Sequence, residues 1–229
     1  MSDAKLIFYY APNACSMAPH IALEETGADF EARQIDLDKR EQFSPEFMSV
    51  SPLGRVPAMI IDGQAITELP ALLTFIATLD PEAKLVPPVG TLAFARCFEW
   101  LGFMSTSVHV IYAQFRRPER YVPLDFPLLD ELTEHGRANT VRLYHEVERR
   151  LTGLWAAGDN YSIADINLFP FFTWAWRLNL DIRKECPRWA ALFDKLLERP
   201  AVQRVLAREG LALETAGDFA RVKFVRVEQ

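Results

Sequence analysis

The sequence predicts a mixed fold in which a small α/β domain precedes an all-helical domain. Strand and helix signals alternate over residues 1–82 in the order β-α-β-α-β-β-α, which is typical of a compact unit built on a mixed sheet. Three prolines and a glycine within residues 81–90 indicate a linker, which we place at 83–90. Residues 91–229 show helical periodicity without a convincing strand pattern, so we expect only helices there.

The first strand is expected at residues 5–10, a short apolar and aromatic run. Residues 16–26 follow a turn-rich loop and should form a helix, because Ser16 can cap its start and Gly27 can end it. Residues 30–37 alternate apolar and polar side chains, which predicts the second strand.

A helical or irregular segment is expected at 41–49. Residues 56–61 and 64–66 then predict a β-hairpin, because the Asp-Gly pair between them favours a tight two-residue turn. The domain should close with a helix over about residues 70–80, with Pro70 at its first position.

The second domain opens with apolar side chains at helical spacing over residues 91–116. Ser162 and Asp165 form a capping box at the start of a later helix, with Asp in place of the usual Glu. The further helices are expected at about residues 128–157, 163–178, 187–198 and 201–208.

The composition is that of an ordinary globular chain of 229 residues, with 50% hydrophobic and 24% charged residues. No apolar run approaches the roughly 20 residues of a membrane span, and the N-terminal residues lack a signal-peptide pattern. We therefore expect a cytoplasmic protein that does not bind membranes. The net charge of −6 arises in the first domain, which argues against nucleic-acid binding, since that needs clustered positive charge.

The three cysteines, Cys15, Cys97 and Cys186, form no disulfide framework, and no His, Cys, Asp or Glu cluster has the spacing of a metal site. Cys15 lies where a strand gives way to a helix, and the helix N–H groups and dipole there lower the pKa of a thiol. Cys15 is therefore a candidate nucleophile. The alternative interpretation is that it serves only as a small apolar residue at the boundary between the two elements. The other two cysteines are expected to be structural.

Two further features fall on the same edge of the α/β unit. Val56-Pro57 stands at the start of the third strand, where a cis proline would leave Val56 free to pair with an extended ligand. Glu68 precedes the last helix of the domain, whose first N–H groups could hold a carboxylate while Glu68 holds an ammonium group. The alternatives are an ordinary strand-start proline and a surface glutamate.

His109 lies beside the apolar stripe of its helix, on a face of small residues. These residues are Gly102, Ser105, Thr106 and Ala113. Small neighbours suggest the close approach of another helix, a subunit or a ligand, with a solvated or core histidine as the alternative. The remaining histidines lie in charged stretches and are expected at the surface: His20, His135 and His145.

Five segments form a specific pattern when taken in order: Phe8–Ser16, Ser51–Met59, Ile66–Glu68, Glu99–Leu101 with His109, and Tyr161–Phe169. Over about residues 4–211 the chain thereby resembles the glutathione S-transferases, most closely their beta (bacterial) class. The resemblance implies a thioredoxin-like first domain that binds glutathione and a helical domain that supplies most of the electrophile pocket. It also implies a homodimer.

The resemblance further implies roles for single residues. Cys15 would lie close to the glutathione sulfur, with His109 facing that sulfur and Tyr10 beside it. Contacts to glutathione, the co-substrate, would come from Ser16, Arg40, Arg55, Val56, cis-Pro57, Glu68 and Leu69. The hydrophobic electrophile would lie against an aromatic wall of Tyr112, Phe115 and Trp174. No metal is implied.

Three positions depart from the family pattern. Leu69 replaces a small or hydroxyl residue. Gly102 replaces a polar residue that can reach toward the partner's glutathione, and Val110 replaces a lysine that can follow the histidine. These changes weaken glutathione affinity or shift specificity but leave the backbone interactions in place.

The leading hypothesis is conjugation of the glutathione thiolate to hydrophobic electrophiles. One alternative is thiol–disulfide exchange through Cys15, whose Cys-Ser-Met-Ala motif holds a single sulfur. Another is a non-catalytic binding module on the same fold.

Overall fold

The computed structural model describes residues 5–216 and 221–227, and its N-terminal domain is built on a four-stranded sheet. The strands are β1 (Leu6–Tyr10), β2 (Glu31–Gln34), β3 (Ala58–Ile61) and β4 (Gln64–Thr67). They lie in the order β2-β1-β3-β4, with β2 parallel to β1 and the other pairs antiparallel. The predicted mixed sheet is confirmed, and so is the tight turn, since Asp62 and Gly63 both have positive φ.

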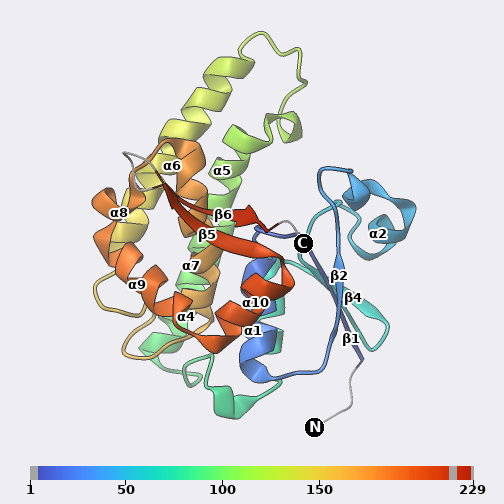
Figure 1. The fold of residues 1–229 in the computed structure, drawn as a ribbon, viewed down its shortest axis with the longest axis vertical. Helices are drawn as coiled ribbons and strands as arrows, with labels where there is room; N and C mark the ends of the chain where they lie inside the picture. The colour runs from blue at the N-terminus through green and yellow to red at the C-terminus, as the bar shows by residue number, and fades with distance from the viewer. Residues whose placement is uncertain (1–4, 217–220, 228–229) are drawn as a thin grey trace.

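Helices cover both faces of this sheet (Figure 1). They are α1 (Met17–Thr26), α2 (Pro45–Val50) and α3 (Leu69–Ile76), with short helices η1 (Glu41–Phe43) and η2 (Pro81–Ala83). Leu6, Phe8 and Tyr10 of β1 enter the main core with α1 and α3, whereas Ile7 and Tyr9 pack in a smaller cluster with α2. This alternation explains why β1 reads as an unbroken apolar run, because both of its faces are buried.

The start of α1 differs from the expectation. The Ser16 side chain does not cap the helix; its hydroxyl instead accepts from the Ala11 N–H and donates to the Ala11 carbonyl, both at 3.1 Å. Ser16 therefore closes the loop that precedes α1. Gly27 ends the helix in the left-handed conformation, as predicted. Helix α3 ends at Ile76, four residues before the expected boundary.

The second domain consists mainly of helices packed around α7. They are α4 (Leu92–Phe103), η3 (Met104–Val108), α5 (His109–Arg116), η4 (Pro118–Arg120), α6 (Leu129–Arg150), α7 (Ile163–Trp174), η5 (Ala175–Leu178), α8 (Ile182–Glu185), α9 (Pro187–Leu197) and α10 (Pro200–Arg208). Every residue of α7 is buried, and Ser162 and Asp165 form the predicted capping box at its start. In the described part of the chain, no helix is both long and apolar enough to cross a membrane.

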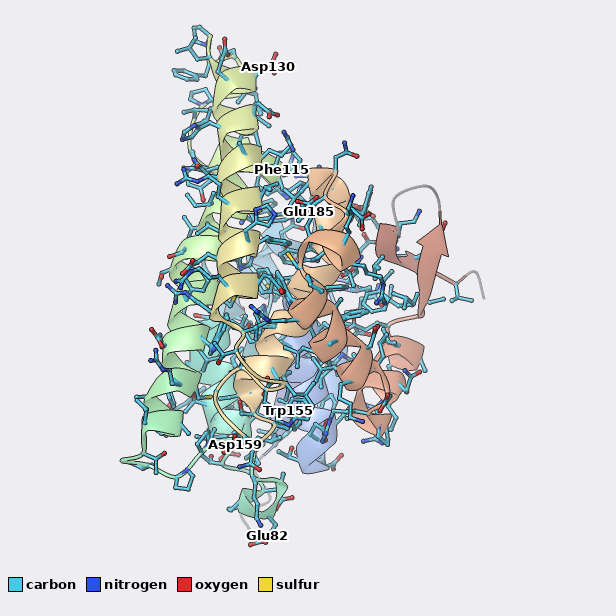
Figure 2. All side chains as sticks on the ribbon, turned by 90° about the vertical axis from the view of Figure 1, so that its left-hand side faces the viewer. Glu82, Phe115, Asp130, Trp155, Asp159 and Glu185 are labelled. Carbon is cyan, nitrogen blue, oxygen red and sulfur yellow. The ribbon has the colours of Figure 1, made fainter. Side chains whose placement is uncertain are left out.

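Helices α5 and α6 form a pair that extends beyond the rest of the molecule at the top of Figure 1. Figure 2 shows Asp130 near the outer end of α6 and Phe115 beside this helix. A Cβ added to Gly136 of α6 would lie 2.9 Å from the Phe115 backbone nitrogen. Only glycine allows the two helices to approach so closely.

The expectation of an all-helical second domain is wrong at its end. Residues Leu211–Ala216 and Arg221–Arg226 form the antiparallel strands β5 and β6. Phe224 of β6 is buried, with its ring 5.8 Å from that of Phe169 and 6.4 Å from that of Phe193. The hairpin therefore packs on the helical core, where its apolar face is covered.

His20 is a second correction, because it is fully buried and not at the surface. Helix α1 is covered by α7 and α10 of the second domain, which leaves little of it exposed. The His20 Nδ1 atom lies 2.9 Å from Oε1 of Glu209, just beyond α10, and Glu209 is itself buried. A second carboxylate oxygen of Glu209 accepts the Asn13 N–H at 3.1 Å. Glu209 thus joins the end of the second domain to the loop before α1.

Candidate glutathione site

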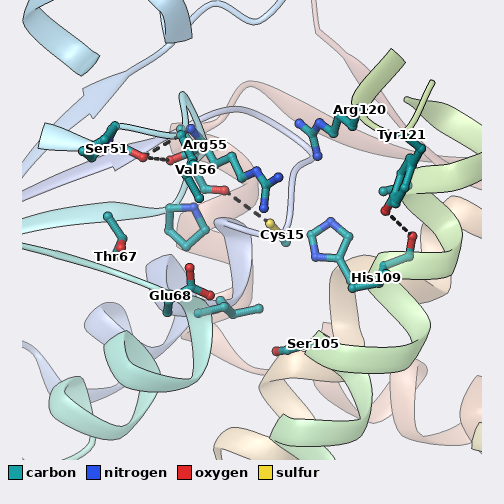
Figure 3. A pocket seen from close by; sticks show the side chains of 16 residues that line it. Cys15, Ser51, Arg55, Val56, Thr67, Glu68, Ser105, His109, Arg120 and Tyr121 are labelled. Carbon is teal, nitrogen blue, oxygen red and sulfur yellow. Dashed lines mark hydrogen bonds between the residues drawn. The ribbon is translucent and has the colours of Figure 1, made fainter. Parts of the chain in front are cut away.

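The predicted site residues gather around a cavity of about 230 Å³ between the two domains, which we call the first cavity. Its walls are the loop before α1, the loop before β3, the start of α3 and one face of α5 (Figure 3). Three separate segments of the N-terminal domain therefore meet α5 and the residues that flank it, Ser105, Arg120 and Tyr121, at this point.

The loop before β3 is held in a fixed shape. The Ser51 hydroxyl donates to the Arg55 carbonyl at 2.8 Å and accepts the Arg55 N–H at 3.2 Å. Gly54 has φ of 59°, and a Cβ there would lie 2.8 Å from the Phe43 ring. The Val56-Pro57 bond is cis, as predicted. The Val56 N–H has no backbone partner among the described residues, so it is free to pair with an extended ligand.

Glu68 closes the opposite side of the first cavity. It stands immediately before α3 with φ of 72°, and its side chain makes no capping hydrogen bond. No ion pair or side-chain hydrogen bond of Glu68 is found within residues 5–216 and 221–227. Its carboxylate can therefore bind a cationic group, and the first N–H groups of α3 beside it can bind an anionic group.

Cys15 differs from the expectation in its acidity. The thiol is buried, and this burial raises its pKa to about 12, outweighing the backbone hydrogen bonds and the Arg120 charge that lower it. Its Sγ atom donates to the Val56 carbonyl at 3.6 Å. Burial therefore disfavours the thiolate form of Cys15, because the helix end does not compensate for desolvation.

His109 faces Cys15 across the first cavity (Figure 3). Its ring lies 5.3 Å from Phe171 and 5.6 Å from Trp174, between centroids. Burial, and to a smaller extent the charges of Arg120 and Arg55, lower the pKa of His109 to about 4. The imidazole is thus neutral at pH 7 and available as a hydrogen-bond donor or acceptor.

We expect His109 to make stability depend on pH. Its pKa rises from about 4 in the folded protein toward the ordinary 6.5 in the unfolded chain. Between these values the unfolded state binds more protons, so the free energy of unfolding falls as pH falls from 6.5 to 4. The free energy of unfolding of the His109→Asn variant should also fall over this range, but by on the order of 2 kcal/mol less than that of the parent. Urea unfolding at pH 7 and pH 4.5 measures the difference, and equal losses in both proteins contradict the assignment.

A second cavity of about 400 Å³ adjoins the first, and we call it the second cavity. The Tyr112 and Trp174 rings, which stack at 4.8 Å between centroids, form one wall. Leu211 and Phe224 of the C-terminal hairpin form part of another. The Trp174 indole also donates to the Asn13 carbonyl at 3.2 Å, which fixes the wall to the loop that carries Cys15.

Comparison with known proteins identifies the family. The family model described as "Glutathione S-transferase, N-terminal domain" matches residues 4–78. The model described as "Glutathione S-transferase, C-terminal domain" matches residues 128–195. Glutathione S-transferase GstA of Escherichia coli O157:H7 is 32% identical over 208 residues, covering 89% of this chain and 98% of the relative. The chain belongs to the glutathione S-transferase family.

Solved structures agree with this assignment. A glutathione transferase homologue from Sulfitobacter with bound glutathione matches with a TM-score of 0.84 at 27% identity, covering 89% of this chain and 98% of the other. The bacterial beta-class glutathione S-transferase of Sphingomonas chungbukensis matches with a TM-score of 0.76 at 32% identity, covering 89% and 98%. The predicted thioredoxin-like domain and beta-class likeness are confirmed.

This glutathione S-transferase brings most of the predicted site residues together. Seven of them line the first cavity: Cys15, Arg55, Val56, Pro57, Glu68, Leu69 and His109. Tyr112 and Trp174 line the second. Within the described residues, no group of three or more His, Cys, Asp or Glu side chains could hold a metal ion.

Four predicted residues line neither cavity. Tyr10 is buried with its ring 4.9 Å from that of His20, and burial raises the pKa of its hydroxyl. Ser16 is bonded to its own loop. Arg40 lies over the Phe43 ring at 5.3 Å, and Phe115 packs against the core.

Sequence reasoning missed one group of residues in this glutathione S-transferase. The missed lining residues include five arginines: Arg116, Arg117, Arg120, Arg177 and Arg226. Three of them stand close together in the Phe-Arg-Arg-Pro-Glu-Arg run that begins at the end of α5, and this local excess of positive charge was a readable signal. The hairpin was also readable, because residues 221–224 alternate polar and apolar side chains.

Proposed function

We propose that this glutathione S-transferase conjugates the glutathione thiolate to hydrophobic electrophiles. It would bind glutathione in the first cavity and the electrophile in the second. The observation that carries the proposal is that both cavities are lined by Cys15, Val56 and His109. A sulfur placed between these residues is in reach of glutathione contacts on one side and the aromatic wall on the other. Such placement turns a bimolecular reaction into an intramolecular one.

The contacts proposed for glutathione follow from groups left without partners. The extended cysteinyl backbone would pair with Val56, whose N–H is free. The γ-glutamyl ammonium would meet the Glu68 carboxylate, and the γ-glutamyl carboxylate would meet the N–H groups at the start of α3. Arg55 would hold the other carboxylate of the peptide.

The thiol of glutathione would be activated by neutral His109 and by the positive charge of Arg120. The imidazole accepts a hydrogen bond or the thiol proton, and the nearby guanidinium favours the thiolate. The thiolate then forms a carbon–sulfur bond with the electrophile, whose leaving group departs with its electron pair. The proton passes to solvent.

We expect Cys15→Ala to retain conjugation, within about tenfold of the parent kcat/KM for 1-chloro-2,4-dinitrobenzene. Cys15 is a buried thiol that donates to the Val56 carbonyl, so the reacting sulfur belongs to glutathione. The assay measures initial rates at saturating glutathione, with glutathione affinity measured in parallel by calorimetry. Retained binding with abolished conjugation would show that the Cys15 sulfur reacts itself.

The geometry does not favour thiol–disulfide exchange, because burial and a pKa of about 12 leave very little Cys15 thiolate at neutral pH. Mass spectrometry after incubation with oxidised glutathione tests this, since a stoichiometric adduct on Cys15 contradicts the preference. The non-catalytic alternative predicts no heat on titration with glutathione.

A homodimer in the cytoplasm completes the proposal. Large apolar side chains remain exposed at Phe43, Leu53, Val89 and Leu92, as expected for a surface covered by a second subunit. The three cysteines are free, which suits a reducing compartment. Light scattering after size-exclusion chromatography measures the mass, and a monomer at micromolar concentration contradicts the dimer.

A further inference from the structure

Six arginines surround the second cavity and its border with the first: Arg55, Arg116, Arg117, Arg120, Arg177 and Arg226. They come from four places in the fold, namely the loop before β3, the α5–η4 segment, η5 and β6. Asp38 is the one acidic residue that lines the same cavity within the described ranges. The concentration of positive charge is therefore local, in a chain whose net charge is −6.

These six guanidinium groups differ from most other arginines of the described chain, which pair with a carboxylate. Helical arginines such as Arg137, Arg149 and Arg183 form ion pairs with nearby carboxylates. None of the six forms an ion pair with a residue that the structure describes. Like charges held together with little counter-charge repel one another, so the cluster favours binding of an anion.

The charges act on one another and on the groups around them. Partial desolvation lowers the pKa of Arg120, and the neighbouring Arg55 and Arg117 lower it further. Arg177 and Arg116 lie close enough to the Tyr112 hydroxyl to oppose the rise in its pKa that burial causes. The arginines therefore border both the reacting centre and the aromatic wall.

Glutathione accounts for only part of this cluster. Arg55 and Arg120 line both cavities and can serve the carboxylates of the peptide. Arg116, Arg117, Arg177 and Arg226 line the second cavity alone. These four would face the electrophile, and a neutral electrophile would leave them without a counter-charge.

We propose that the electrophile of this enzyme is an aromatic molecule that carries an anionic group such as a carboxylate or sulfonate. The inference rests on the proposed function and narrows its substrate class. The ring would lie on Tyr112 and Trp174, and its anionic substituent would point toward Arg177, Arg116 and Arg226. Forked guanidinium groups suit planar carboxylates and tetrahedral sulfonates alike.

A pair of substrates that share the same reacting ring but differ in charge tests the inference: 4-chloro-3,5-dinitrobenzoate and its methyl ester. In each, the glutathione sulfur bonds to the ring carbon that bears chlorine, the carbon–chlorine bond breaks, and chloride leaves with the electron pair. The thiol proton goes to solvent, and the carboxylate or ester is unchanged. Rates with free glutathione in buffer correct for the different reactivity of the two rings.

After this correction we expect the parent enzyme to prefer the carboxylate in kcat/KM by about tenfold or more. The double variant Arg177→Gln/Arg226→Gln should lose most of this preference. Arg142→Gln, which removes a positive charge at an exposed position of α6 outside both cavities, is the control and should keep it. Raising the salt concentration should reduce the preference of the parent enzyme. No preference in the parent, or the same preference in the double variant, overturns the inference.

A binding experiment separates this inference from the proposed function. Calorimetry in the presence of glutathione compares unreactive 3,5-dinitrobenzoate with its methyl ester. Tighter binding of the carboxylate that depends on Arg177 and Arg226 supports the anionic site. This holds even if neither chlorinated ring is turned over, because a lack of turnover would reject only the proposed conjugation. Equal binding of acid and ester with normal turnover of both rejects the anionic site and leaves conjugation intact.

Discussion

Replacing Glu209 by alanine is expected to lower the free energy of unfolding by about 3 kcal/mol. The carboxylate is buried and has two partners, His20 Nδ1 at 2.9 Å and the Asn13 N–H at 3.1 Å. Truncation leaves the buried His20 nitrogen and the half-buried Asn13 N–H without a partner and opens a cavity beside them. Urea denaturation at pH 7, followed by tryptophan fluorescence, measures the loss.

A double-mutant cycle isolates the contribution of the Glu209–His20 contact. His20 is packed among the rings of Phe8, Tyr10 and Phe30, so His20→Phe conserves its shape and removes its nitrogen atoms. We expect Glu209→Ala to cost 1–2 kcal/mol less in the His20→Phe background, roughly the coupling of a buried charged hydrogen bond. Additive losses would refute a direct interaction. Glu209→Ala should also raise KM for the electrophile, because Asn13 lines the second cavity.

Replacing Glu68 by glutamine is expected to weaken glutathione binding by about 100-fold. Glutamine keeps the size of the side chain and the backbone at φ of 72°, and removes only the negative charge. The peptide ammonium then loses its counter-charge inside the first cavity, where water is partly excluded. Isothermal titration calorimetry with reduced glutathione gives the dissociation constant directly.

The control for this experiment is Glu82→Gln, an exposed acidic residue of η2 that is distant from both cavities. It changes the net charge by the same amount and should leave the dissociation constant within about twofold. If Glu68→Gln binds glutathione as tightly as this control, the γ-glutamyl end does not lie against Glu68.

Features fixed by local chemistry could be predicted from the sequence. The Asp62-Gly63 turn, the Gly27 helix end and the Ser162–Asp165 capping box all depend on residues within one turn of one another. The edge that carries Val56 and Glu68 was also predicted, since the order of strands and helices places both loops at the same end of the sheet.

Features that depend on packing between distant parts of the chain could not be predicted from the sequence. His20 appears in a charged stretch of sequence, and its partner Glu209 lies 189 residues away. The rise in the Cys15 pKa depends on how completely α5 and the loop before β3 cover the thiol. The arginine cluster is assembled from four segments, of which one alone shows an excess of positive charge in the sequence.

The position of α1 between the domains sets an order of events during synthesis. The N-terminal domain leaves the ribosome first, but one side of α1 is covered by α7 and α10, which follow more than a hundred residues later. Until then this apolar surface and His20 remain open to water or to a chaperone. The first domain thus reaches its final packing after translation of the last helix, and a chain truncated before residue 200 displays the surface that proteases and chaperones recognise.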